Sequence, residues 1–149
     1  NQPDAELAAV LTASRQPDLL AATDVLGRIG YLAPRVSILD MAGLTERHIA
    51  RYGHPEPPFG RSDFEYVLER KPHLIMNNVR AAWTRHLKLA GFVEGYWWLD
   101  RTPWTRPAGS HTRPRFVFVR RGSVLEAEIR TRYPRARFRP PTDLGSDRG

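Results

Sequence analysis

Short apolar runs alternate with helical patterns along most of the chain, and this alternation constrains the fold more than any other feature. Short apolar runs predict strands at residues 19–25, 35–40, 73–78, 96–100 and 115–122, the second of them rich in β-branched residues and the last two in aromatic residues. Apolar residues at helical spacing predict helices at residues 4–15, 45–53, 62–72, 79–92 and 123–134. Elements in this order favour βαβ units and a parallel sheet covered on both faces.

The last two predicted strands are close enough in sequence to pair as an antiparallel hairpin. We therefore expect a three-layer α/β sandwich, Rossmann-like in outline, whose mostly parallel sheet ends in an antiparallel C-terminal hairpin edge. A length of 149 residues fits one domain with a substantial core. We expect this α/β domain to span residues 1–139, and residues 140–149 to form a disordered tail.

Composition places the chain among water-soluble globular proteins, with 41% hydrophobic and 26% charged residues. No apolar run approaches the roughly 20 residues that a membrane helix needs. The chain has no cysteine, which excludes disulfide bonds and thiolate metal sites. It begins at Asn1 rather than at a methionine, which we interpret as the sign of a processed or excised piece.

The net charge of +7 raises the question of a polyanionic partner. Most basic residues are arginines, and many lie late in the chain, in the stretches RPRFVFVRRG and RTRYPRARFRPP. A basic stripe is typical of phosphate binders, and it also occurs as an ordinary solvated surface. Because no zinc-finger spacing, ribonucleoprotein motif or convincing helix-turn-helix accompanies the charge, nucleic acid is not the expected partner.

Polar side chains follow three of the predicted strands. Asp24 ends the first, Asp40 the second, and Asn77 the third. In open α/β sheets, ligands bind outside the carboxyl ends of the strands, so these residues are candidates for one shared site. The alternative is that both aspartates only cap the turns that follow them. The sequence leaves both interpretations open.

Motifs for other chemistries do not match. Gly27 and Gly30 form G-x-x-G rather than the dinucleotide fingerprint, and no P-loop or nucleophile elbow occurs. The spacing of His48, His54 and Glu56 fits no common metal site. We therefore expect no metal and no cofactor. Asp24 and Asp40 could form an acid–base pair only if the fold sets a suitable separation.

An aromatic cluster, YWWLDRTPW, is the other unusual feature. On a strand, Trp97 must face opposite Tyr96 and Trp98, so both faces need a cover. Burial under flanking helices is one explanation, because large aromatic residues dominate protein cores. The other explanation is contact with a glycan or a membrane interface, because the ring faces of tryptophan suit both.

The string AATDVLGRIGYLAPRVSILDMAGLTERHIAR, followed by DFEYVLERKPHLIMNN, resembles the soluble C-terminal region of bacterial GT-C type membrane glycosyltransferases. These enzymes use polyprenyl-phosphate sugars and include arabinofuranosyltransferase-like and mannosyltransferase-like proteins. The resemblance covers about residues 19 to 78. The matching residues are Asp24, Gly27, Gly30, Tyr31, Asp40, Gly43, Leu44, Thr45, Ile49, Ala50, Tyr66, Val67, Leu68, Arg70 and Pro72.

This resemblance implies a periplasmic, extracytoplasmic domain joined to a membrane-embedded catalytic portion of the same polypeptide. Since the family's catalytic acid lies in the membrane region, it implies no catalytic residue in this chain. The implied role is acceptor-glycan binding, regulation or assembly in cell-envelope glycan synthesis, with a glycan or lipid-linked sugar as ligand. The strand ends, their neighbouring loops and helix, and the aromatic cluster supply the candidate contacts, which are Asp24, Tyr31, Asp40, Thr45, His48, Arg61, Asn77 and Trp97.

The sequence departs from the family pattern at several positions. PFGRSD stands where the family often has Gly-His-x-Lys, so that only Arg61 supplies a charge there. Glu46 and His73 stand where aspartate is common. Two alternatives stay open: an independent small α/β enzyme using Asp24, Asp40 and His48, and a basic module that binds polyanions.

Overall fold

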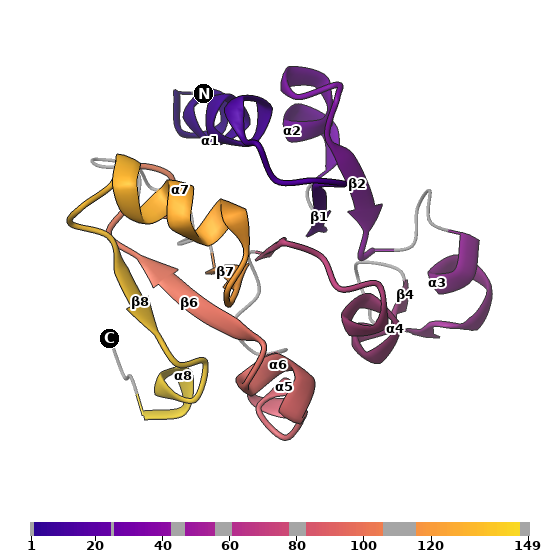
Figure 1. Ribbon diagram of the computed structural model, residues 1–149. Helices are drawn as coiled ribbons and strands as arrows, with labels where there is room; N and C mark the ends of the chain where they lie inside the picture. Colours follow the sequence, from indigo (N-terminus) through magenta and orange to yellow (C-terminus); the bar gives the residue numbers. More distant parts are fainter. Residues whose placement is uncertain are drawn as a thin grey trace.

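A six-stranded mixed sheet forms the centre of the protein in the computed structural model (Figure 1). The structure describes residues 2–24, 26–42, 47–55, 61–77, 83–105 and 116–146. The strands of this sheet lie in the order β2-β1-β5-β7-β6-β8. Their bounds are β1 Leu20–Thr23, β2 Ser37–Asp40, β5 Leu74–Asn77, β6 Tyr96–Asp100, β7 Phe116–Arg120 and β8 Arg137–Arg139.

The sheet divides into a parallel half and an antiparallel half. Strands β2, β1 and β5 are parallel, whereas β7 is antiparallel to β5 and to β6, and β8 is antiparallel to β6. The described sheet thus has two parallel and three antiparallel pairings, and is mixed rather than mostly parallel. The β6–β7 hairpin is confirmed. It does not form the edge, because β8 pairs with the outer side of β6.

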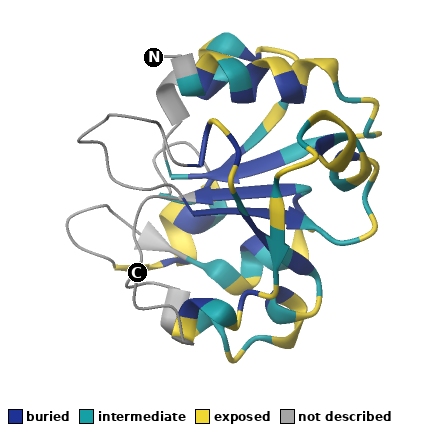
Figure 2. Cartoon of the chain, turned by 90° about the vertical axis from the view of Figure 1, so that its left-hand side faces the viewer, coloured by how far each residue is buried: buried dark blue, intermediate teal, exposed yellow. Residues whose placement is uncertain are grey.

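Helices flank both faces of the sheet (Figures 1 and 2). A separate two-stranded ladder joins β3 and β4 between α3 and α4. The bounds of the helices and of this ladder are α1 Gln2–Ala13, α2 Leu26–Leu32, α3 Arg47–Tyr52, β3 His54–Pro55, β4 Arg61–Ser62, α4 Phe64–Glu69, α5 Trp83–His86, α6 Ala90–Val93, α7 Val124–Arg132 and α8 Asp143–Ser146. No helix in the described ranges has the length and apolar character needed to cross a membrane.

Alternation along the strands produces an apolar core on each face of the sheet, as side chains on a strand point to opposite faces in turn. In β5, Leu74 and Met76 belong to one core cluster, while Ile75 belongs to the other. Residues of α1, α2 and α7 complete the first cluster. Residues of α3, α4, α6 and α8 complete the second. The strands are accordingly mostly buried in Figure 2.

Three features of the fold differ from the sequence-based expectation. Residues 26–32 form α2 although Gly27 and Gly30 disfavour a helix, because Ile29 packs in the first core cluster. The helix expected over residues 79–92 is divided, and Leu89 adopts extended backbone between α5 and α6. Helix α1 already begins at Gln2, so Asp4 lies inside it rather than at its cap.

The segment expected to be a disordered tail contains α8. Leu144 is only 4% exposed and packs in the second core cluster. The Nε of Arg139 donates a hydrogen bond to Oδ2 of Asp143, 3.0 Å away, which ties α8 to the end of β8. The expectation is therefore corrected for residues 140–146, since an apolar side chain and an ion pair hold them against the sheet.

Candidate functional site at the strand ends

The carboxyl ends of β1 and β2 lie side by side. Thr23 is the register partner of Asp40, and the backbone N–H of Met41 donates to the carbonyl of Thr23 over 2.9 Å. Asp24, which follows Thr23, and the turn that follows Asp40 therefore lie at the same edge of the sheet. Strand β5 ends at that edge as well, because Thr23 is also paired with Met76.

Asp40 is held by the turn that it begins. Its side chain is only 1% exposed, and its Oδ1 accepts a hydrogen bond from the backbone N–H of Ala42 at 2.9 Å. This is the local side-chain-to-backbone bond by which an aspartate stabilises a tight turn. The capping interpretation of Asp40 is thus supported, and its carboxylate has little surface to offer a ligand.

Asp24 and Asn77 also take the expected positions. Asp24 follows β1 and is half-buried, with its Oδ1 in the interior. Asn77 is the last residue of β5, opposite Phe116, and its side chain lies outside the described part. Thr45 falls outside the described residues altogether. Asp24 is consequently more exposed to solvent than Asp40 at this edge.

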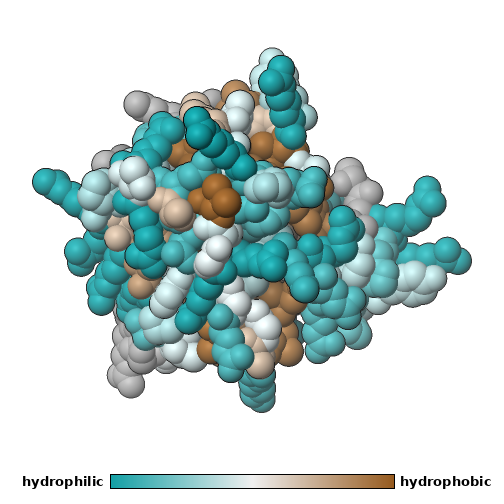
Figure 3. All heavy atoms as spheres, in the orientation of Figure 1, coloured by the Kyte–Doolittle hydropathy of each residue, from teal (hydrophilic) through white to brown (hydrophobic). Residues whose placement is uncertain are grey.

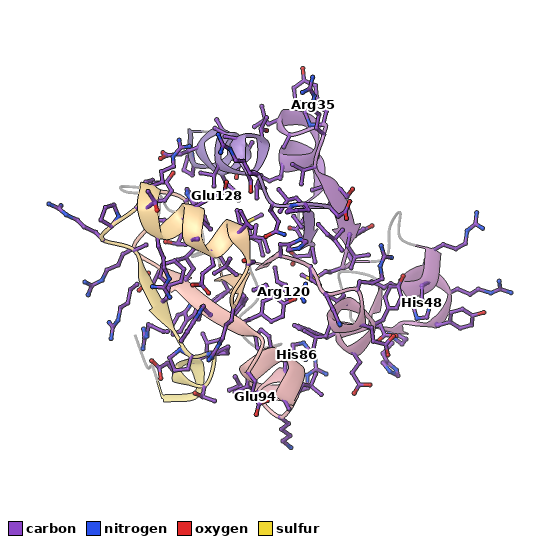
Figure 4. All side chains as sticks on the ribbon, viewed as in Figure 1. Arg35, His48, His86, Glu94, Arg120 and Glu128 are labelled. Carbon is purple, nitrogen blue, oxygen red and sulfur yellow. The ribbon has the colours of Figure 1, made fainter. Side chains whose placement is uncertain are left out.

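His48 lies in a surface cluster between α3 and α4, on the side of the molecule toward which β2 points (Figures 1 and 4). Its ring stacks on that of Tyr66, with 3.8 Å between the centroids and an interplanar angle of 15°. Its Nε2 is 3.5 Å from Oδ2 of Asp63, whose other oxygen accepts from the N–H of Tyr66 and caps α4. Asp63 and Tyr66 therefore form part of the capped first turn of α4, and His48 packs against that turn.

Tyr52 was not singled out from the sequence, and Arg70 was named only as a match to the family pattern. Tyr52 lies 5.2 Å from His48 between ring centroids and is 62% exposed, so it presents an aromatic face to solvent. Arg70 donates from a guanidinium nitrogen to the hydroxyl of Tyr66 over 3.1 Å. The i, i+4 spacing of His48 and Tyr52 on a short helix was the signal that could have identified the pair. Together they form the exposed aromatic cluster His48–Tyr52–Tyr66.

Tyr31 and Arg61, two further candidate contacts, lie in different elements of the structure, α2 and β4. Tyr31 is 83% exposed near the end of α2, which leads into the start of β2, so it lies toward the opposite end of the strands from Asp40 (Figure 1). The expectation that Tyr31 borders the strand-end site is therefore wrong, because helix and strand run in opposite directions. Arg61 begins β4 and pairs with Pro55, while its side chain is not among the described ones.

Trp97 lies in the antiparallel half, three strand positions from β1 or about 14 Å at the usual spacing. Its indole Nε1 donates to Oε1 of Glu126 over 3.0 Å, and the guanidinium of Arg121 lies 3.8 Å from its ring centroid. Tyr96 and Trp98 are buried on the other face. The structure thus separates Trp97 from the strand-end residues and gives it a packing role.

Glu126 organises the surroundings of Trp97. Its carboxylate also accepts from the N–H of Gly122 at 3.0 Å and pairs with Nε of Arg130 at 2.8 Å. Burial raises the pKa of Glu126, but the hydrogen bonds from Arg130, Gly122 and Trp97 outweigh it, and the pKa is lowered. Ser123, three residues earlier, caps α7 by accepting from the N–H of Glu126. The S-x-x-E pattern of a capping box was the sequence signal for this arrangement.

The chemistry that these residues can perform follows from their partners. Asp40 is engaged with a backbone N–H, and His48 is engaged with Tyr66 and Asp63. These partners give Asp40 a role in the turn after β2 and His48 a role in the contact between α3 and α4. Within the described ranges, no group of three or more His, Cys, Asp or Glu side chains is arranged to hold a metal ion. The arrangement instead offers a polar strand edge and, between α3 and α4, a ring cluster in which Tyr52 is exposed.

One known protein family matches most of the length of this chain. The family described as a domain of unknown function (DUF8728) matches residues 1–134. The chain belongs to the DUF8728 family. The match takes in the strands β1 to β7 and helix α7, whereas β8 and α8 of this DUF8728 member lie beyond it. No curated protein and no solved structure matches the chain.

Proposed function

We propose that this DUF8728 domain is the soluble, extracytoplasmic domain of a bacterial GT-C type membrane glycosyltransferase, and that it assists acceptor-glycan binding or assembly in cell-envelope glycan synthesis. In this proposal the chain is not catalytic, carries no cofactor, and works with the membrane-embedded portion of the same polypeptide at the periplasmic face. A glycan or a lipid-linked sugar is its ligand. The proposal also describes the fold as a three-layer, Rossmann-like sandwich.

The observation that carries the proposal is the pairing of the two motifs on which the resemblance depends. The D-x-x-G-Y motif begins at Asp24 and the D-x-x-G-L-T motif begins at Asp40. The register of β1 with β2 and the bond between Met41 and Thr23 bring the two motif starts to one edge. Ligands of open α/β sheets bind at this kind of edge.

The exposed aromatic cluster His48–Tyr52–Tyr66 adds the second element of a sugar site. Carbohydrates combine hydroxyl groups with apolar ring faces, so a site for them needs polar groups next to aromatic surface. Tyr52 presents such a face, and Asp24 supplies a half-buried carboxylate at the strand edge. Carboxylates disfavour a phosphate ligand by like-charge repulsion, which favours a neutral glycan here.

Equilibrium binding of short arabinofuranose and mannose oligosaccharides tests the proposal, with two exposed tyrosines as matched variants. Tyr52→Ala should weaken binding of the preferred oligosaccharide by about three- to tenfold, the scale of one aromatic contact. Tyr31→Ala, at the other end of the strands, should leave binding unchanged. Equal effects of both variants, or no binding of either sugar, would refute the proposal.

An activity assay tests the non-catalytic part of the proposal. The pure chain should not transfer sugar from a polyprenyl-phosphate donor, since the family's catalytic acid lies in the membrane region. Transfer by the isolated chain that Asp40→Ala abolishes would instead identify the chain as an independent enzyme.

A further inference from the structure

The charge of the molecule is divided between the two halves of the sequence. Residues 1–78 contain eight Lys/Arg and ten Asp/Glu, a net charge of −2. Residues 79–149 contain fifteen Lys/Arg and six Asp/Glu, a net charge of +9, and the two halves give the +7 of the whole chain. The parallel half with the candidate glycan site is thus slightly acidic, and the remainder is strongly basic.

Not all of the late arginines are free to bind an anion. Arg130 is paired with Glu126, and Arg139 with Asp143. The guanidinium of Arg121 donates to the carbonyl oxygens of Tyr96 and Val93 while it covers Trp97. These side chains are therefore committed to the fold, and their charge is partly neutralised or covered.

Three arginines, at the end of α7, in the turn that follows it and at the start of β8, remain exposed. Arg132, Arg135 and Arg137 lie within six residues, and their side chains make no hydrogen bond or ion pair among the described residues. Arg132 approaches only the ring of Tyr133, at 5.7 Å. Hydrophilic side chains project from the side of the molecule where β8 lies (Figures 3 and 4). We name Arg132, Arg135 and Arg137 the basic edge.

We propose that the basic edge docks the domain on an anionic phospholipid surface. This proposal rests on the proposed function, in which the domain is joined to a membrane protein. Each arginine near an anionic bilayer strengthens binding by about fivefold. Three would give weak attachment of a free protein, but a joined domain has a high effective concentration at the membrane. The contact would thus fix which side of the domain faces the bilayer.

The character of the edge favours a lipid surface over nucleic acid. Proteins that bind single-stranded nucleic acid combine basic grooves with aromatic platforms for the bases. The exposed large hydrophobic residues in the described part are Tyr31, Tyr52 and Val124, and neither tyrosine belongs to α7 or β8. The edge thus has charge for phosphates, whereas its nearest rings, Tyr133 and Phe138, are partly buried rather than open platforms for bases. With β8 toward the bilayer, the oppositely placed parallel half would face away from it (Figure 1).

A simpler role for these arginines is protection of the sheet. Charged residues on an edge strand prevent it from pairing with another chain, and β8 is the edge strand of this half. That role predicts no preference for anionic lipid beyond what the net charge produces. The test therefore needs two variants with the same net charge.

The test is co-sedimentation of the 149-residue chain with vesicles of 60% phosphatidylcholine and 40% phosphatidylglycerol in 100 mM NaCl. The edge variant Arg132→Gln/Arg135→Gln/Arg137→Gln should bind at least about tenfold more weakly than the wild type. The matched control is Arg35→Gln/Arg47→Gln/Arg51→Gln, which removes three exposed arginines of the parallel half. This control should lose less than about threefold, although both variants carry the same net charge.

Three outcomes would overturn the proposal. Equal weakening by both variants would show that net charge alone attracts the protein to the vesicles. Wild-type binding by the edge variant would leave only the protective role of β8. Tighter binding of a 20-nucleotide single-stranded DNA than of the vesicles would identify nucleic acid as the partner. Unchanged circular dichroism and unfolding midpoints verify that the variants fold, and oligosaccharide binding by the wild type tests the proposed function separately.

Discussion

Polar side chains at strand ends have two possible uses, and individual residues of this protein show how the structure separates them. A buried carboxylate is costly unless hydrogen bonds satisfy it. Asp40 is 1% exposed and accepts from the N–H of Ala42, so its first role is to hold the turn after β2. Asp24, at the neighbouring position, is half-buried and better placed for a ligand. The two aspartates that looked alike in sequence thus differ in role.

Removal of the Asp40 carboxylate should destabilise the protein. Asp40→Ala leaves the N–H of Ala42 without its acceptor, and we expect a loss of about 0.5–2 kcal/mol in the free energy of unfolding, the usual range for a lost cap. Urea denaturation followed by circular dichroism measures it. Glu69→Ala, an exposed change at the end of α4, is the control and should stay within about 0.5 kcal/mol. An unchanged midpoint for Asp40→Ala would remove the capping role.

His73 makes the stability depend on pH in the neutral range. Its Nδ1 accepts from the N–H of Leu20 at 3.1 Å, which requires the unprotonated nitrogen and links the start of β5 to β1. Burial and the nearby Arg120 lower the pKa of His73, while Asp18 raises it by a smaller amount. Because the folded pKa lies below the unfolded value, this contribution is complete above about pH 6.5 and is lost as the pH falls below it.

The variant His73→Asn isolates this effect, since its amide oxygen can replace Nδ1 as acceptor and does not titrate. Between pH 7.5 and 5.5, the unfolding free energy of the wild type should fall by more than that of the variant. Parallel curves for the two proteins, measured by urea denaturation at each pH, would contradict the role assigned to His73.

At the scale of elements, the sequence predicted most of the sheet and less of what surrounds it. The strands β1, β2, β5, β6 and β7 were predicted because each lies in a short apolar run between turn signals, and β6 and β7 are also rich in aromatic or β-branched residues. Strand β8 was not, because Arg137 and Arg139 flank a single apolar residue, Phe138, and only its pairing with β6 makes it a strand. Helix α2 was not predicted, because its glycines disfavour a helix. The packing of Ile29 that stabilises it is a tertiary contact.

The site was predictable to a similar degree. Chain direction in a parallel sheet was enough to bring Asp24, Asp40 and Asn77 to one edge. The position of Tyr31 depended on a helix that the sequence did not indicate. Tyr66 as the stacking partner of His48 depended on the contact between α3 and α4, which is a tertiary contact with no local signal.

Helix α8 should contribute to the stability of the whole domain. Leu144→Ala removes a side chain that is 4% exposed in the second core cluster, and we expect a loss of about 2 kcal/mol, the low end for such a truncation near the surface. The matched control is Thr142→Ala, an exposed residue of the same segment. If thermal unfolding shows the same small change for both variants, α8 does not pack on the sheet in solution.

At the scale of the whole molecule, the protein presents two different surfaces. The parallel half carries the strand-end edge and the exposed aromatic cluster His48–Tyr52–Tyr66, and residues 1–78 have a net charge of −2. The antiparallel half carries the basic edge, which runs from the end of α7 to the start of β8, the strand at the other end of the strand order. A domain that holds a neutral glycan with one half and faces an anionic bilayer with the other would suit an enzyme that works on glycans at a membrane surface.

Mapping of a bound glycan by NMR tests the central claim most directly. The chain, labelled with ¹⁵N, would be titrated with the arabinofuranose or mannose oligosaccharide that it binds more tightly, and the backbone amide shifts followed. We predict that the shifts cluster at Asp24, Met41 and Ala42 and in α3 around His48, while the amides of β6, β7 and α7 stay unchanged. Shifts confined to the surroundings of Trp97, or no shifts at millimolar sugar, would contradict the assignment of the strand-end edge as a glycan site.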